Sequence, residues 1–335
     1  MAVLTLALLA LMALCMLFGS VDIDAKSVAD ILLGRGSNNT AWKVIVLQSR
    51  LPMVIVAMLA GAALSVSGLL LQTTFNNPLA GPSILGVSSG AGFGVAVVML
   101  AMGGTIGGMA GEATSGYVAT LIGALVGSGA VLALLMLFSV VLHSSAMLLI
   151  LGILVSYLTS SVVSLLNSVA SEDGVRNYVA WGFGNFSSVS MEQLPLFAGV
   201  TVVTLAAAML MIKPLNALLL GTRYAENLGV NTRLTRNVLL LVTGVLTAVV
   251  TAYCGPIGFV GLVVPHIARL ALNTSDHARL LPATLLAGAD VTLLCTLISV
   301  TNERGIIPIN AITPIVGVPI IIYVILNRKR IQYFN

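Results

Sequence analysis

One five-residue motif of this chain resembles the nucleophile elbow of serine hydrolases: Gly86-Val87-Ser88-Ser89-Gly90. In such enzymes the elbow is a strained turn that exposes a serine to a histidine and an acid. Here the motif opens a long apolar segment, and the histidines fall at the ends of other apolar segments, at His143, His266 and His277. We therefore expect no catalytic residue, and an intramembrane serine hydrolase around Ser88 is kept as an alternative.

The small residues of this motif have a simpler use. Glycine and serine let membrane helices approach closely and form hydrogen bonds across the contact. Gly123 and Gly127 repeat a small-residue spacing further along the chain. We predict that both segments are helix-packing contacts.

Asp290 is the one acidic residue inside a predicted membrane span. A carboxylate within the bilayer is costly and is a functional candidate for a proton relay or a polar pathway. The sequence offers no second intramembrane acid or base that could complete such a relay. A structural role is therefore favoured, and a proton-coupled secondary transporter that uses Asp290 is the alternative function.

Motifs for nucleotide and metal binding are missing from the sequence. A phosphate-binding loop needs a glycine directly before its lysine, and no lysine of the chain has one, at Lys26, Lys43, Lys213 or Lys329. We expect no metal site, because the histidines and the separated Cys15, Cys254 and Cys295 lack ligand spacing. We expect no cofactor in this chain, so ATP hydrolysis, if it drives the function, belongs to another polypeptide.

The composition indicates the fold class. Of 335 residues, 58% are hydrophobic and 8% are charged, and the mean hydropathy is +1.08. A soluble domain carries about a quarter charged residues, so a soluble enzyme and a nucleic-acid binder are excluded. We predict an all-α polytopic membrane protein with a single transmembrane domain over 1–335. Spans of about 20 residues fit about ten apolar runs: 3–19, 47–71, 84–104, 117–141, 146–168, 194–212, 236–254, 260–273, 281–301 and 311–327.

The charged residues of the loops predict the orientation in the membrane. With the N-terminus inside, the basic residues of the inner loops outnumber those of the outer loops, and Arg328, Lys329 and Arg330 follow the last span directly. Cytoplasmic loops carry an excess of lysine and arginine. We therefore predict that both termini are cytoplasmic.

The predicted inner loop at 214–232 is the most unusual segment. Ala225 and Leu228 are three residues apart, and Gly229 is a good helix stop. A short amphipathic helix on the cytoplasmic face suits the groove of a partner protein. The alternative is a helix that lies flat on lipid headgroups.

Three long motifs, in order along the chain, resemble the permease subunits of ABC importers for iron chelates and cobalamin. The resemblance runs from about residue 45 to the C-terminus. The motifs are Arg50-Leu51-Pro52 with Asn77-Pro78-Leu79-Ala80 and 85–91; Gly255 to Arg269 with Leu281-Pro282; and Pro308-Ile309 with Thr313, Gly317 and Pro319.

This resemblance implies a type II ABC importer permease in the bacterial inner membrane. It implies a homodimer with the pathway at its interface, lined by 146–168 and 311–327. It also implies two separate ATP-binding subunits that use ATP and Mg²⁺, an extracytoplasmic substrate-binding protein, membrane lipid around the chain and no nucleic acid. The cargo is expected to be a bulky chelate, with ferric siderophore first, then cobalamin, then haem.

The resemblance also implies roles for single residues. The expected cytoplasmic gate is His143, Ser144, Ser145 and Ala146. The expected ATPase-coupling residues are Gly221, Thr222, Arg223, Tyr224, Ala225, Glu226, Leu228 and Gly229. Met53 and Ser299 stand where relatives often have further docking arginines, so the expected binding-protein contacts are Arg50 and Arg304.

Overall fold

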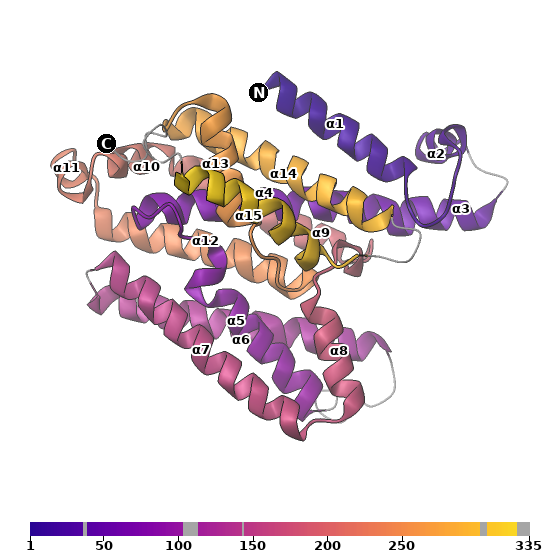
Figure 1. Cartoon of the computed structure of the whole chain (residues 1–335), viewed down its shortest axis with the longest axis horizontal. Helices are drawn as coiled ribbons and strands as arrows, with labels where there is room; N and C mark the ends of the chain where they lie inside the picture. Colours follow the sequence, from indigo (N-terminus) through magenta and orange to yellow (C-terminus); the bar gives the residue numbers. More distant parts are fainter. Residues whose placement is uncertain (36–38, 103–112, 143, 302–306, 327–335) are drawn as a thin grey trace.

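The computed structural model describes residues 1–35, 39–102, 113–142, 144–301 and 307–326, and within these ranges every regular element is helical (Figure 1). The α-helices are α1 (Ala2–Leu17), α2 (Ala25–Leu32), α3 (Thr40–Val44), α4 (Leu51–Thr74), α5 (Val87–Ala96), α6 (Ala113–Val141), α7 (Ser145–Val169), α8 (Glu172–Gly182), α9 (Leu194–Leu210), α10 (Ile212–Leu219), α11 (Thr222–Asn227), α12 (Thr232–Cys254), α13 (Val260–Leu272), α14 (His277–Val300) and α15 (Ile309–Leu326). Four short helices complete the order: η1 (Ile45–Arg50), η2 (Pro82–Leu85), η3 (Val97–Ala101) and η4 (Phe186–Ser188).

The predicted spans correspond to helices. Among the described residues, 5 helices are long and apolar enough to cross a membrane, and α9 and α10, which meet at a bend of 50°, are long and apolar enough only when taken together. The remaining predicted spans coincide with shorter apolar helices, which are Ala2–Leu17, Val87–Ala101, Val260–Leu272 and Ile309–Val324. The all-α polytopic fold is therefore confirmed.

Two of the short spans begin after a break in helical structure, where the chain is continuous but its backbone is irregular. Extended backbone and η2 precede α5, and the turn at Gly255 precedes α13. Irregular backbone at membrane depth is tolerated only where it is buried in protein or lines a water-filled cavity. Asn310 from α15 covers the second break, because its side-chain amide nitrogen donates to the Gly182 carbonyl at 2.9 Å and its oxygen accepts from the Gly258 N–H at 3.2 Å.

α4 is the central helix of the bundle. In the helical segment Thr40–Thr74, which contains α4, 83% of the residues in the 18-residue apolar stretch are buried inside the protein. α4 packs against α1, α9, α12, α13 and α14. A Cβ at Gly61 would overlap the Gly288 carbonyl of α14, and one at Gly68 would overlap the Gly261 carbonyl of α13. Glycine at these positions lets the helix backbones touch, as is usual in membrane bundles.

Glycines also join α5 to α6. Gly90 packs on Gly127 and Gly94 packs on Gly123, in each case against the carbonyl of the facing glycine. The helix-packing prediction is therefore confirmed. Ser88 Oγ lies 3.1 Å from Thr251 Oγ1 on α12, which gives this hydroxyl a structural partner.

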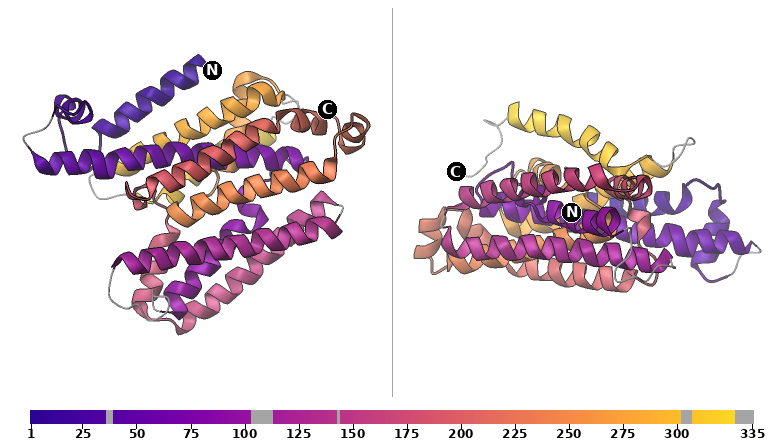
Figure 2. Two further views of the ribbon diagram at one scale, coloured as in Figure 1. Left: turned by 180° about the vertical axis from the view of Figure 1, so that it is seen from behind. Right: turned by 90° about the horizontal axis from the view of Figure 1, so that it is seen from below.

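α12 connects two groups of helices. Figures 1 and 2 show α5, α6, α7 and α8 on one side of α12 and the α4-centred group on the other. α12 packs against α4 and α9 in one group and against α5 and α6 in the other. A movement of α12 would therefore change its packing against both groups.

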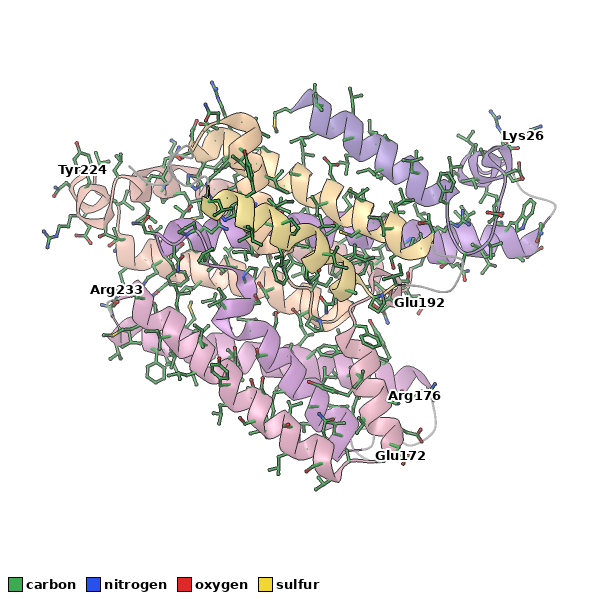
Figure 3. The ribbon with its side chains drawn as sticks, in the orientation of Figure 1. Lys26, Glu172, Arg176, Glu192, Tyr224 and Arg233 are labelled. Atoms are coloured by element: carbon green, nitrogen blue, oxygen red, sulfur yellow. The ribbon has the colours of Figure 1, made fainter. Side chains whose placement is uncertain are left out.

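Several polar and charged residues mark the two opposite ends of the helices. Figure 3 shows Tyr224 and Arg233 at one end and Lys26, Glu172, Arg176 and Glu192 at the other. The first group lies on the predicted inner side and the second on the predicted outer side. We call these the inner and outer ends below.

Candidate functional site

The segment predicted to couple to a partner projects from the inner end as α10 and α11 (Figure 1). Gly221, with φ 94°, separates the two helices, and Gly229, with φ 84°, ends α11. The Gly229 N–H donates to the Glu226 carbonyl at 2.9 Å and the Val230 N–H to the Ala225 carbonyl at 3.0 Å. These two bonds form the glycine-terminated cap of a helix end, so Gly229 is required by its conformation.

An exposed apolar stripe runs along this projection. Leu220, Tyr224 and Leu228 are four residues apart and are 57%, 58% and 58% exposed. Tyr224 and Leu228, on α11 and at its C-cap, have the spacing that places two residues on one face of a helix, and Leu220 is the C-cap residue of α10 just before them. Ala225 is 0% exposed and faces the bundle, so Ala225 and Leu228 do not share a face as their spacing suggested. The three exposed residues, which we call the α11 stripe, present apolar surface to the inner side.

The exposed remainder of the predicted coupling set is Gly221, Thr222, Arg223, Glu226 and Gly229. Glu226 Oε1 accepts a hydrogen bond from Thr232 Oγ1 at 2.7 Å, which ties α11 to the first residue of α12. The apolar stripe is therefore held on a short helix with fixed ends.

α10 is fastened to the bundle by one asparagine. Asn216 Nδ2 donates to Asp276 Oδ1 at 2.7 Å, and Asn216 Oδ1 accepts from the His277 N–H at 2.8 Å. Thr73 Oγ1 of α4 lies 2.8 Å from His277 Nε2. The Ala278 N–H and the Asn216 amide hold the pKa of Asp276 below its ordinary value. This network joins the projection to α14 and to the central α4.

The predicted gate lies at the turn between α6 and α7, also at the inner end. Ser144 is the exposed N-cap residue of α7, Ser145 is its first helical residue, and Ala146 is exposed. His143 lies outside the described residues. The gate and coupling segments are therefore at the same end of the molecule.

α7 carries a hydroxyl-rich exposed face. Only 22% of the residues in its 18-residue apolar stretch are buried inside the protein. One side of the helix carries four exposed residues with hydroxyl groups, which are Tyr157, Ser161, Ser164 and Ser168. Polar groups are disfavoured against hydrocarbon and usually face protein or water-filled space. This face is thus suited to line a polar pathway that another protein surface covers. α15 lies on the same side of the molecule as α7, since both are toward the viewer in Figure 1.

Arg50, predicted to dock a binding protein, is 4% exposed at the outer end. Its guanidinium donates to the carbonyls of Met16 and Leu17, at 2.7 and 2.8 Å, and to that of Val21. These oxygens belong to the end of α1 and the segment after it, where helix carbonyls lack intrahelical partners. Docking through Arg50 stays a prediction, and these three carbonyls engage both terminal nitrogens of its guanidinium. Arg304 lies outside the described residues.

Asp290, on α14, is 8% exposed, and neither of its carboxylate oxygens has a hydrogen-bond partner among the described residues. The two described histidines bond to other groups: His266 Nε2 is 2.8 Å from the Pro78 carbonyl, and His277 bonds to Asn216 and Thr73. The described part of the chain therefore gives Asp290 no relay partner.

Sequence reasoning missed the buried polar contacts at the inner end. Arg269 Nη1 donates to Gln72 Oε1 at 2.7 Å, and Gln72 Nε2 donates to the Leu262 carbonyl at 3.1 Å. Gln72 and Asn216 are polar residues beside apolar runs, which is a weak signal by itself. Their partners lie far away in sequence, so tertiary structure was needed to identify them.

Comparisons with known proteins agree along nearly the whole chain. A model of the FecCD transport family matches residues 6–327. The chain is 32% identical to the hemin transport system permease protein HmuU of Yersinia pestis, over 97% of this chain and 96% of that protein. It is 35% identical to the vitamin B12 import system permease protein BtuC of Citrobacter koseri, over 86% of this chain and 84% of that protein.

The fold is also similar to a solved structure, described as a metal-chelate type ABC transporter in an inward-facing conformation. The two chains superpose with a TM-score of 0.81 and 29% sequence identity, and the match covers 97% of each. The similarity therefore extends over nearly the whole length of both chains.

Proposed function

Because the chain belongs to the FecCD transport family, we propose that it is the membrane permease subunit of an ATP-driven importer of a bulky metal chelate. The observation that carries this function is the α11 stripe, an apolar surface at the inner end that suits the groove of an ATP-binding subunit. Two such subunits use ATP and Mg²⁺, and the permease itself performs no covalent chemistry.

The proposed assembly contains two copies of this chain in the bacterial inner membrane, with both termini cytoplasmic. The pathway runs between the copies along α7 and α15, whose exposed faces support this placement. The gate at Ser144, Ser145 and Ala146, with His143, closes its inner end. A binding protein delivers the cargo at the outer end, where Arg50 and Arg304 are the proposed contacts.

Alternating access follows from differential partner contacts. ATP binding changes the position of the ATP-binding subunits, the α11 stripe follows them, and the gate opens or closes as the population shifts. Charge-free hydroxyls on α7 hold a large ligand weakly and let it leave. Relatives named for hemin and for vitamin B12 support a metal chelate as the cargo class.

Asp290→Asn separates this function from proton coupling. An ATP-driven importer should keep uptake within about twofold of the parent, because Asp290 has no relay partner among the described residues. Uptake would be measured in proteoliposomes that contain the ATP-binding subunits, with and without ATP. Loss of uptake in this variant, with transport by the parent that follows a proton gradient without ATP, would contradict the proposal and support the carrier.

A further inference from the structure

Two arginines of α12 cap a different helix. Arg233 Nη2 donates to the Val140 carbonyl at 2.7 Å, and Arg236 Nη2 donates to the Ser139 carbonyl at 2.7 Å. Ser139 Oγ also donates to Asn237 Oδ1 of α12 at 2.6 Å. Three bonds thus join the first turns of α12 to the last turn of α6. We call Arg233 and Arg236 with their two carbonyl acceptors the arginine latch.

α6 needs this cap from outside. The last carbonyls of a helix have no intrahelical partner, and cations near a helix C-terminus are stabilising. The last turn of α6 contains no basic residue of its own. The latch therefore supplies both the hydrogen-bond donors and the positive charge at this helix end.

The latch lies between two segments that were predicted separately. On one side, the bond from Thr232 to Glu226 ties α12 to α11, and Asn231 caps α12 by accepting from the Leu234 N–H at 2.9 Å. On the other side, α6 ends at Val141, and Ser144, the N-cap residue of α7, belongs to the predicted gate of His143, Ser144, Ser145 and Ala146. Hydrogen bonds therefore join α11 to the start of α12, and the start of α12 to the end of α6, which the predicted gate follows closely in sequence.

We propose that Arg233 and Arg236 are positioning residues that transmit movement of the coupling helix to the gate through the end of α6. This inference rests on the proposed function and identifies the contact through which the coupling acts. When α11 moves with an ATP-binding subunit, the start of α12 moves with it, and the latch obliges the α6 terminus and the gate turn to follow. Without the latch, the α6 terminus would lose two of the three hydrogen bonds that join it to the first turns of α12, so it would follow α12 less closely.

Accessibility of the gate turn tests this inference. Ser144→Cys places a thiol on an exposed gate residue, while the native Cys15, Cys254 and Cys295 are all buried. The complex of permease and ATP-binding subunits would be labelled with a hydrophilic maleimide, without nucleotide and after trapping with ATP and vanadate. We expect the labelling rate of the parent to change severalfold between the two states.

Arg233→Gln with Arg236→Gln should bring the ratio of the two labelling rates close to one, while the ATP-binding subunits stay bound and still hydrolyse ATP. Arg233→Lys with Arg236→Lys, which keeps charge and donors, should restore part of the change. Arg279→Gln, an exposed arginine at the same end and outside the latch, is the matched control and should behave as the parent.

Arg233→Gln alone keeps the test valid if the double variant does not fold, because Arg233 is exposed and its loss leaves the core intact. If the double or the single Gln variant shows the same nucleotide-dependent change in labelling rate as the parent, the role of the latch is overturned and the proposed function is not. If the labelling rate of the parent is the same without nucleotide and after trapping with ATP and vanadate, the proposed function is overturned, and so is the role of the latch.

Discussion

Glutamate in place of Tyr224 and Leu228 is expected to release the ATP-binding subunits and abolish uptake. Each side chain is 58% exposed in the isolated chain, and its burial in a partner groove is worth about 1.5 kcal/mol or more. Loss of both contacts amounts to roughly a 100-fold weaker association, before the cost of burying two charges. Binding of the detergent-solubilised permease to the ATP-binding subunit would be measured by titration.

Leu33→Glu is the matched control for this prediction. Leu33 is an exposed leucine at the outer end, 65% exposed, and the same substitution there should leave the ATP-binding subunit bound. The double variant should remain a dimer with an unchanged unfolding midpoint, because the α11 stripe contributes little to the core. Normal association of the double variant would place the coupling surface elsewhere.

Arg50→Met is expected to destabilise the permease even in the absence of a binding protein. The methionine fills a similar volume but leaves the carbonyls of Met16, Leu17 and Val21 without their donor. An unsatisfied buried acceptor costs about 1–3 kcal/mol, so the unfolding midpoint should fall clearly. Cys15, which is buried on α1 beside Met16, should also react faster with a maleimide.

Arg35→Met is the control for Arg50. Arg35 is also at the outer end, but its side chain is 71% exposed. Its Nη1 atom lies 4.0 Å from Asp30 Oδ1, and such surface ion pairs contribute little to stability. We expect its stability and its Cys15 protection to match the parent. If Arg50→Met keeps both properties and loses only affinity for the binding protein, the arginine acts in docking and not through α1.

The sequence was sufficient to predict the fold. Charge gaps and apolar runs place the spans where helices are found, and the motifs from Arg50 to Pro319 identify the type II importer permease fold. This works because a chain that crosses a bilayer must satisfy its backbone hydrogen bonds internally, so long apolar runs mark membrane-spanning helices. The packing use of Gly123 and Gly127 was also predictable, since small residues at that spacing have few other uses in membrane helices.

The detailed contacts were less predictable. Arg50 looked like an exposed docking residue because its motif resembles one, and nothing in the sequence shows that α1 ends against it. Ala225 looked like part of the outward face, but the position of α11 on the bundle turns it inward. Arg233 and Arg236 read as loop charges for the positive-inside rule, and only their distance to α6 identifies a latch. Such contacts join residues far apart in sequence and depend on tertiary structure.

The most direct test of the central claim is to purify the tagged chain from native membranes in mild detergent and identify what remains bound. Mass spectrometry should find an ATP-binding subunit at close to one copy per permease chain, together with a metal chelate, and the assembly should take up that chelate only with ATP. Recovery of the chain alone, with uptake after reconstitution that needs no ATP, would contradict the importer function.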